Sequence, residues 1–174
     1  MNRINSVFTA TGLVLAIGAS LAAGDAQAVT ASRILSANAT SYCQTSLPVF
    51  DGQIRKRPLA VQNEGTSNAF VTCSFTRHWN SNAATGIQMF AQNNTSAAQS
   101  LTCTMVTGFS TGANQFVPKT VSLPAGGAQV SMSWLPADFS GGIFPDTQYS
   151  LSCNLLPGEG LNDSYVDFVE DVGA

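Results

Sequence analysis

The stretch from Gln99 to Thr107, QSLTCTMVT, decides the fold, because apolar and polar residues alternate through its centre. Leu101, Cys103 and Met105 fall on one side of an extended chain. The Asn-rich turn 93–96 precedes the stretch, and the Gly/Ser/Thr stretch 108–112 follows it. The pattern therefore predicts a β-strand that presents one side, cysteine included, to a hydrophobic core.

The same pattern recurs along the chain, and turn clusters such as 124–127 and 157–160 separate the runs. No segment shows helical periodicity over a useful length. The predicted strands are Leu59–Asn63, Ala69–Arg77, Gly86–Asn93, Gln99–Thr107, Val117–Leu123, Gln129–Trp134, Thr147–Leu155 and Ser164–Glu170. Leu101, Cys103 and Met105 are expected to face the core. The other side chains expected to do so are Val71, Cys73, Phe75, Val130, Met132, Trp134, Tyr149, Leu151, Cys153 and Leu155. Short strands at regular spacing favour an all-β sandwich.

The first 28 residues have the pattern of a secretory signal. Arg3 supplies the positive start, an apolar run follows from Val7 to Ala23, and Ala26-Gln27-Ala28 supplies a small-x-small cleavage site. We therefore expect cleavage after Ala28 and no transmembrane anchor. The predicted organisation is a signal peptide (1–28), a turn-rich N-terminal segment (29–57) and a β-sandwich domain (58–174).

Charge is scarce in this chain. Lys and Arg number 7 and Asp and Glu number 10, so that charged residues make up 10% of the sequence, well below the usual quarter. A nucleic-acid-binding protein usually carries a net basic field, whereas the formal net charge here is −3. The composition favours an extracellular β-protein with a neutral, hydrogen-bonding surface and excludes nucleic acid as the expected partner.

Four cysteines follow the predicted cleavage site: Cys43, Cys73, Cys103 and Cys153. An even number in an exported chain favours two disulfides, in any of three connectivities. The cysteines form no close C-x-x-C pair, and the chain has one histidine, so that zinc is the weaker interpretation. We expect no metal and no cofactor.

The stretches IQMFAQNNTSAAQSLTCTMV (87–106), KTVSLPAGGAQVSMSW (119–134) and TQYSLSCNLLPG (147–158) together resemble bacterial immunoglobulin-like modules of the CARDB-like type. The resemblance implies an immunoglobulin-like antiparallel sandwich of about seven or eight strands. In that topology the strands of Cys103 and Cys153 are neighbours. The resemblance thus implies a Cys103–Cys153 disulfide, and the remaining pair, Cys43–Cys73, would tether the N-terminal segment.

The N-terminal half contains YCQTSLPVFDGQIRKRPLAVQNEG (42–65) and AFVTCSF (69–75), and it is similar to uncharacterised small exported proteins of Gram-negative bacteria. That similarity brings no activity with it. An immunoglobulin-like architecture hosts many unrelated functions. Function must therefore be argued from individual residues.

Gly108–Gly112, GFSTG, matches the spacing of a hydrolase nucleophile elbow, with Ser110 in the nucleophile position. An elbow needs a helix after the serine, whereas another strand is predicted here. A catalytic serine usually relies on a histidine, and His78 precedes Ser110 with no Asp or Glu between them. We interpret GFSTG as a loop between strands.

Two groups of residues are candidates for binding. The basic triplet Arg55-Lys56-Arg57 suits phosphate, anionic lipid headgroups or lipopolysaccharide, although a solvated loop or a protected sheet edge explains it more simply. Trp79 ends its strand in phase with Phe75, which favours a place at the rim of the core, and stacking on a sugar ring is its alternative role. Trp134 is in phase with core residues.

The sequence predicts a secreted or periplasmic, non-enzymatic β-sandwich with a binding or cell-surface structural role. Its partner would be an unknown protein or a surface glycan, and self-association is a further expectation. A subunit of a surface fibre or adhesin is the first alternative. An extracellular serine hydrolase using Ser110 and His78 is the second.

Overall fold

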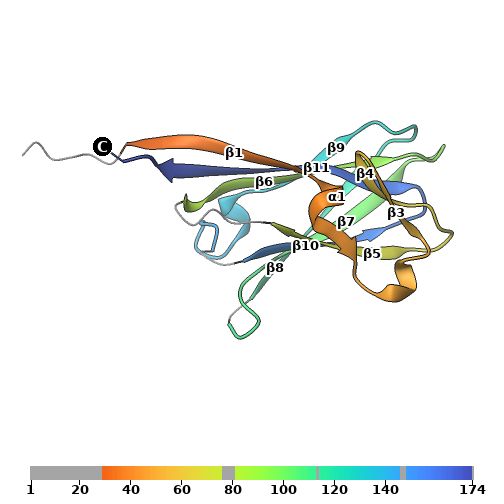
Figure 1. Ribbon diagram of the computed structural model, residues 1–174, viewed down its shortest axis with the longest axis horizontal. Coiled ribbons are helices and arrows are strands. Elements are labelled where there is room, and N and C mark those ends of the chain that lie inside the picture. The colour runs from red at the N-terminus through yellow and green to blue at the C-terminus, as the bar shows by residue number, and fades with distance from the viewer. Residues whose placement is uncertain (1–28, 76–80, 113, 146–147, 174) are drawn as a thin grey trace, which may run out of the picture.

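The computed structural model describes residues 29–75, 81–112, 114–145 and 148–173. Two antiparallel sheets pack face to face (Figure 1). The predicted signal peptide, His78 and Trp79 lie outside the described residues. Within those residues, no helix is long and apolar enough to cross a membrane.

Sheet A runs in the order β3-β4-β11-β6-β9, and β1 also pairs with β11. Its strands are β1 (Thr30–Asn38), β3 (Ile54–Arg57), β4 (Ala60–Asn63), β6 (Ser81–Asn93), β9 (Val130–Trp134) and β11 (Glu159–Asp171). Sheet B runs in the order β2-β5-β10-β7-β8. Its strands are β2 (Cys43–Thr45), β5 (Ala69–Phe75), β7 (Gln99–Thr107), β8 (Gln115–Leu123) and β10 (Tyr149–Leu155). The short helices α1 (Ala39–Tyr42), η1 (Pro48–Phe50) and η2 (Pro136–Asp138) lie in the connections.

All eight predicted strands are present, and β7 has the predicted bounds. The alternation that predicted them is visible in the burial of their side chains. Leu101, Cys103 and Met105 are fully buried between the sheets, as are Val71, Cys73, Leu151, Cys153 and Leu155. Trp134 is also fully buried, which confirms its place in the core. The prediction of an all-β sandwich is therefore confirmed.

Both disulfides implied by the resemblance are confirmed: Cys43–Cys73 and Cys103–Cys153. Each joins residues that lie directly opposite one another on adjacent strands of sheet B. All four cysteines point into the core and are at most 1% exposed. Both covalent links thus lie within one sheet, on its inner side.

The N-terminal segment departs from the prediction. Residues 29–57 were expected to be turn-rich, yet they contribute β1, β2 and β3, so the described residues contain eleven strands and not seven or eight. The nine residues of β1 pair with Asp163–Asp171 of β11. Most β1 side chains are exposed on both sides of the strand, and the sequence therefore lacks the alternation that marks a half-buried strand. Backbone pairing with β11 makes this segment a strand.

Candidate binding face

The outward side of sheet B is a continuous surface of hydroxyl-bearing and other uncharged side chains, which we name the hydroxyl face. Along each strand its residues alternate with the buried ones. Its members are Gln44, Phe70, Thr72, Ser74, Ser100, Thr102, Thr104, Val106, Phe116, Pro118, Thr120, Ser122, Ser150, Ser152 and Asn154. None of these residues carries a charge.

The strand pairing aligns these side chains in rows across the sheet. The central row runs across all five strands of sheet B as Gln44, Thr72, Ser152, Thr104 and Pro118. On one side of it lies the row Phe70, Asn154, Thr102 and Thr120, and on the other side lies the row Ser74, Ser150, Val106 and Phe116. Neighbours within a row are about 4.8 Å apart, and successive rows are about 7 Å apart. The hydroxyls thus form a regular two-dimensional array.

Hydrogen bonds between side chains hold part of this array in place. The hydroxyls of Thr102 and Thr120 are 2.8 Å apart on β7 and β8. At the other side of the sheet, the hydroxyls of Ser46 and Thr72 are 2.7 Å apart. Each pair uses one donor and leaves acceptor capacity on both oxygens.

Two phenylalanine rings flank the hydroxyls on opposite sides of the central row. Phe70 is 44% exposed and Phe116 is 66% exposed. Phe70 lies on β5 and Phe116 on β8, which is three strands away in sheet B. Their rows are four residues apart along the strands, so the two residues lie roughly 20 Å from one another. The ring of Phe50 lies 6.2 Å from that of Phe70 and supports it from η1.

The disulfides lie directly beneath the hydroxyl array. Cys73 sits between Thr72 and Ser74, Cys103 sits between Thr102 and Thr104, and Cys153 sits between Ser152 and Asn154. A covalent link between directly opposed residues prevents a slip in strand register, and such a slip would turn every side chain to the other face. The two disulfides therefore fix the rows as well as the core.

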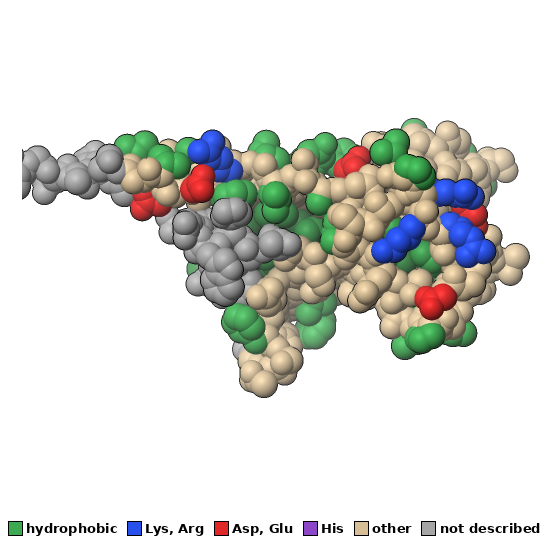
Figure 2. Space-filling view, in the orientation of Figure 1, with side chains coloured by type: hydrophobic (Ala, Val, Ile, Leu, Met, Phe, Trp, Pro, Cys, Tyr) green, Lys and Arg blue, Asp and Glu red, His purple; other side chains and the backbone are tan. Residues whose placement is uncertain are grey.

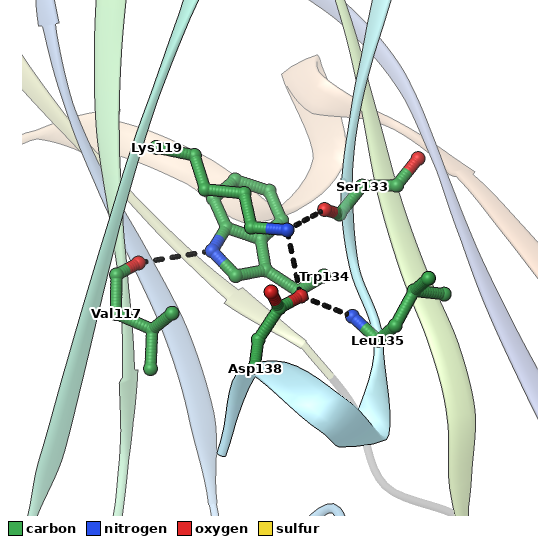
Figure 3. A network of polar contacts seen from close by, with 6 residues as sticks. All are labelled: Val117, Lys119, Ser133, Trp134, Leu135 and Asp138. Carbon is green, nitrogen blue, oxygen red and sulfur yellow. Dashed lines mark hydrogen bonds and ion pairs between the residues drawn. The ribbon is translucent and has the colours of Figure 1, made fainter.

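A polar network secures the β8 edge of the hydroxyl face to sheet A (Figure 3). The Lys119 ammonium donates to the Ser133 carbonyl at 2.7 Å and pairs with Asp138 at 2.6 Å. The indole N–H of Trp134 donates to the Val117 carbonyl at 2.9 Å. Val117 and Lys119 point inward between the outward residues Phe116, Pro118 and Thr120, so these bonds fix the strand that carries them.

Asp138 is the charged centre of that network. Its carboxylate also accepts the backbone N–H of Leu135 at 2.7 Å. Partial burial acts to raise the pKa of Asp138, but the hydrogen bonds from Lys119 and Leu135 and the Lys119 charge outweigh it, so that the pKa lies below its ordinary value of 3.8. Asp138 is therefore ionised at neutral pH, and it stabilises this edge in that form.

The basic triplet lies elsewhere, on the edge strand β3 of sheet A. Arg57 pairs with Glu64 at 2.6 Å, Lys56 donates to the Thr40 carbonyl at 3.2 Å, and Arg55 approaches the Asp51 carbonyl at 3.5 Å. Figure 2 shows Lys and Arg side chains gathered with acidic ones at the end of the molecule where β3 lies. The triplet is thus the charged margin of a sheet edge. Its role in binding stays a prediction.

Ser110 lies in the loop between β7 and β8, and the next strand follows without a helix. The structure thus agrees with the loop interpretation of GFSTG. Gly108 has φ +132°, and a Cβ there would lie 1.9 Å from the Asn114 side chain, so the loop requires glycine at that position. His78 and Trp79 lie outside the described residues, and their proposed roles stay predictions.

The acidic residues near the C-terminus do not form a cluster. Glu170 pairs with Arg33 at 2.8 Å, Asp163 accepts from Asn38 at 3.1 Å, and Glu159 is fully buried. In the part of the chain that the structure describes, no cluster of three or more His, Cys, Asp or Glu side chains is placed to hold a metal ion.

The sequence reasoning missed the hydroxyl face as a site, although a signal for it exists. The triplets Thr72-Cys-Ser74, Thr102-Cys-Thr104 and Ser152-Cys-Asn154 each place uncharged polar residues on both sides of a buried cysteine. Identifying the inward residues also identifies the outward ones. The sequence does not reveal which strands are neighbours, and the rows depend on those neighbours.

No family model matches the chain, and no curated protein matches it. Among solved structures, it is similar to an exo-β-1,3-galactanase from Phanerochaete chrysosporium at 15% identity and TM-score 0.45, covering 77% of this chain and 29% of that one. It is also similar to the C-terminal family 6 carbohydrate-binding module of a Zobellia galactanivorans laminarinase, at 10% identity and TM-score 0.44, covering 77% and 98%. The family 11 carbohydrate-binding module from Clostridium thermocellum is similar at 9% identity and TM-score 0.37, covering 85% and 88%.

At such identities the similarity concerns the β-sandwich, and the ligands of those proteins do not follow for this chain. The resemblances to CARDB-like modules and to exported Gram-negative proteins stay predictions.

Proposed function

We propose that the chain is a non-enzymatic, secreted or periplasmic binding module whose hydroxyl face docks on an extended, uncharged polysaccharide. One observation carries the proposal: the outer side of the five-stranded sheet B bears no charge and presents hydroxyls in register, flanked by the exposed rings of Phe70 and Phe116. The disulfides and the predicted signal peptide support the location.

The chemistry of the hydroxyl face matches that of a sugar chain. A hydroxyl both donates and accepts hydrogen bonds, as sugar hydroxyls do, so Ser and Thr side chains can replace the water around a sugar without exact complementarity. An aromatic ring offers an apolar surface to the C–H side of a sugar ring. Two rings roughly 20 Å apart suit a ligand several sugar units long.

The same features disfavour other partners. Nucleic acids and anionic membranes are bound chiefly through Lys and Arg, and the hydroxyl face has neither. Protein interfaces usually have an apolar core enriched in aromatic residues, Met and Arg. Here the aromatic rings stand at the margins and the centre is polar.

A depletion assay tests the proposal. The protein is mixed with insoluble cellulose, chitin, mannan and β-1,3-glucan, and in parallel with charged polymers such as pectate and heparin resin. We expect retention on at least one uncharged polysaccharide that persists in 1 M salt, because no ion pair contributes. Retention on the charged polymers alone, lost in salt, would contradict the proposal.

The fibre alternative has one specific observation in its favour. β1 is a nine-residue strand whose second edge pairs with no strand among the described residues, and its Ile34 is 68% exposed. Such edges can accept a strand from another molecule. Light scattering at rising protein concentration tests this function: growing assemblies that Ile34→Lys prevents would support it, and a monomer at millimolar concentration would contradict it.

A further inference from the structure

We propose that sheet A carries a second carbohydrate site, separate from the hydroxyl face, which takes a short, uncharged oligosaccharide. The site is a solvent-open groove of about 420 Å³, here named the amide groove. The side chains used in the argument are Arg57, Leu59, Gln62, Gln92, Gln129 and Asn162. Four of these six carry amides, contributed by three strands and by the turn before β9.

The groove lies beside an irregularity in β11. The pairing of β11 with β6 shifts between Leu161 and Ser164, because Leu161 pairs with Ala91 whereas Ser164 pairs with Met89. Such a bulge bends the strand and redirects its side chains. Just before it, Gly160 lies between Gln62 and Gln92 in the register. A Cβ there would lie 3.4 Å from the Gln62 Cβ, so glycine lets β11 lie beside β4 without crowding the Gln62 side chain.

Asn162, within the bulge, is the buried anchor of the groove. It is only 3% exposed. Its Nδ2 donates to the Leu59 carbonyl at 3.2 Å and to Gln92 Oε1 at 3.1 Å, which ties the β3–β4 turn to β6. Its Oδ1 accepts no hydrogen bond from the described residues. A buried acceptor without a partner is costly. Because this oxygen has almost no solvent-accessible surface, a ligand hydroxyl can pair with it only if the Asn162 side chain shifts.

The charge of the groove points to a neutral ligand. Arg57 is the one charged residue of its lining, and its guanidinium is paired with Glu64 by contacts of 2.7 and 2.6 Å. An anionic ligand would have to compete with that carboxylate. The unused guanidinium N–H groups can still donate to a hydroxyl.

The remaining lining suits a sugar. The side-chain amides of Gln62 and Gln129 make no hydrogen bond within the described residues, so each offers a donor and an acceptor to the groove. Gln92 keeps its NH₂ group as a donor, since Asn162 occupies its oxygen. Leu59 is 73% exposed and gives the groove an apolar wall for a C–H surface. The amides can orient a ligand through hydrogen bonds, which is the role of polar groups in small-molecule sites, and Leu59 adds an apolar contact.

Nuclear magnetic resonance of the ¹⁵N-labelled protein reads this site directly. Cellohexaose, mannohexaose and chitohexaose are titrated separately, with hexagalacturonate as the charged comparison. We expect at least one uncharged hexamer to shift the side-chain amide signals of Gln62, Gln92 and Gln129. The signal of Gln88, which lies on the same side of β6 but outside the groove, should stay in place.

Substitutions then test the assignment. Gln62→Ala combined with Gln129→Ala should weaken binding about tenfold, since each removes about one hydrogen bond, with no change in melting temperature. Gln88→Ala is the matched control and should bind like the wild type. Gln129→Ala alone, at an exposed position, keeps the test valid if the double variant is unstable.

Three results would overturn the second site. One is the absence of any shift with the uncharged hexamers. Another is a response to hexagalacturonate only, which would make Arg57 the recognition element. The third is a shift confined to Gln44 and Asn154, which would place the sugar on the hydroxyl face alone. If the protein is not retained on any insoluble polymer in the depletion assay, that result would count against the hydroxyl face. It would not contradict the proposal for the amide groove.

Discussion

Sheet B and sheet A have the same antiparallel architecture, but they differ in regularity. In sheet B the pairings β2–β5, β5–β10, β10–β7 and β7–β8 all run without a register shift. In sheet A the single pairing of β11 with β6 contains three shifts. Both disulfides belong to the regular sheet.

The outer surfaces follow from this difference. Unbroken register aligns side chains in rows, and the outer side of sheet B is therefore an even array suited to a long ligand. A bulge displaces side chains and opens space, and the outer side of sheet A therefore holds a groove suited to a short one. Charges on the outer surfaces follow the same division. The ion pairs Arg33–Glu170 and Arg57–Glu64 belong to sheet A, whereas Lys119 of sheet B points inward and pairs with Asp138. We infer that strand regularity determines the ligand shape for which each outer surface is suited.

The largest effect should come from breaking the covalent support of the regular sheet. Removing Cys103–Cys153 by double substitution to alanine should lower the free energy of unfolding by about 4 kcal/mol, given its separation of 50 residues. It should also weaken polysaccharide binding, because β7 and β10 carry the centre of the rows. Urea unfolding and the depletion assay measure the two effects.

The Cys43–Cys73 disulfide provides the comparison. Its removal should cost nearly as much stability, given a separation of 30 residues. Binding should fall less than after removal of Cys103–Cys153, because this disulfide attaches only the outermost strand β2, which contributes only Gln44 to the hydroxyl face. If the two folded variants, each lacking one disulfide, bound polysaccharide equally well, the disulfides would not be needed to keep the outward side chains of sheet B in register.

A charge in the centre of the hydroxyl face should abolish binding without unfolding the protein. Thr104→Lys places an ammonium in the central row, where an uncharged polymer offers nothing to replace its hydration. We expect binding to fall at least about tenfold, with little change in melting temperature because a lysine can extend into water. Gln88→Lys, on the outer side of sheet A, should bind polymer like the wild type, and a similar loss in that control would refute the assignment to sheet B.

The smallest effect concerns the link between the two sheets. Asp138→Asn should reduce the free energy of unfolding by about 1 kcal/mol at pH 7, because the pair with Lys119 is partly exposed. Since the pKa of Asp138 is lowered by folding, its stabilisation is present above the ordinary value of 3.8 and is lost as the pH falls through the lower folded value.

Unfolding of the wild type and Asp138→Asn at pH 7 and near pH 2.5 measures this dependence. The difference in the free energy of unfolding between the wild type and the variant should be smaller near pH 2.5 than at pH 7. A difference that stays constant would mean that the carboxylate charge contributes nothing to the network.

Much of the fold could be predicted from local alternation, because a strand with one buried side shows its period in its own residues. The sets around Val71, Leu101 and Leu151 were found in this way. β1 could not be found, since its side chains are mostly exposed and only its pairing with β11 defines it. The disulfide pairing came from the resemblance, because the spacing of four cysteines leaves three connectivities open.

The two proposed binding surfaces were harder to predict, for two different reasons. The hydroxyl face needs the strand order β5-β10-β7, which joins residues far apart in the sequence. The amide groove needs a bulge that no local pattern marks, and it collects side chains from Arg57 to Asn162. Of the residues predicted for binding, Arg57 lines that groove, but paired with Glu64 and not as a free cation.

The central claim is that the hydroxyl face binds an uncharged polysaccharide through its two exposed rings. The most direct test is the affinity of Phe70→Ala, Phe116→Ala for whichever insoluble polysaccharide retains the wild type. Ile34→Ala, an apolar change on sheet A at a position as exposed as Phe116, is the control. We expect the double variant to keep its melting temperature and to lose binding at least about tenfold, while the control binds normally. Unchanged affinity in the double variant would contradict the claim.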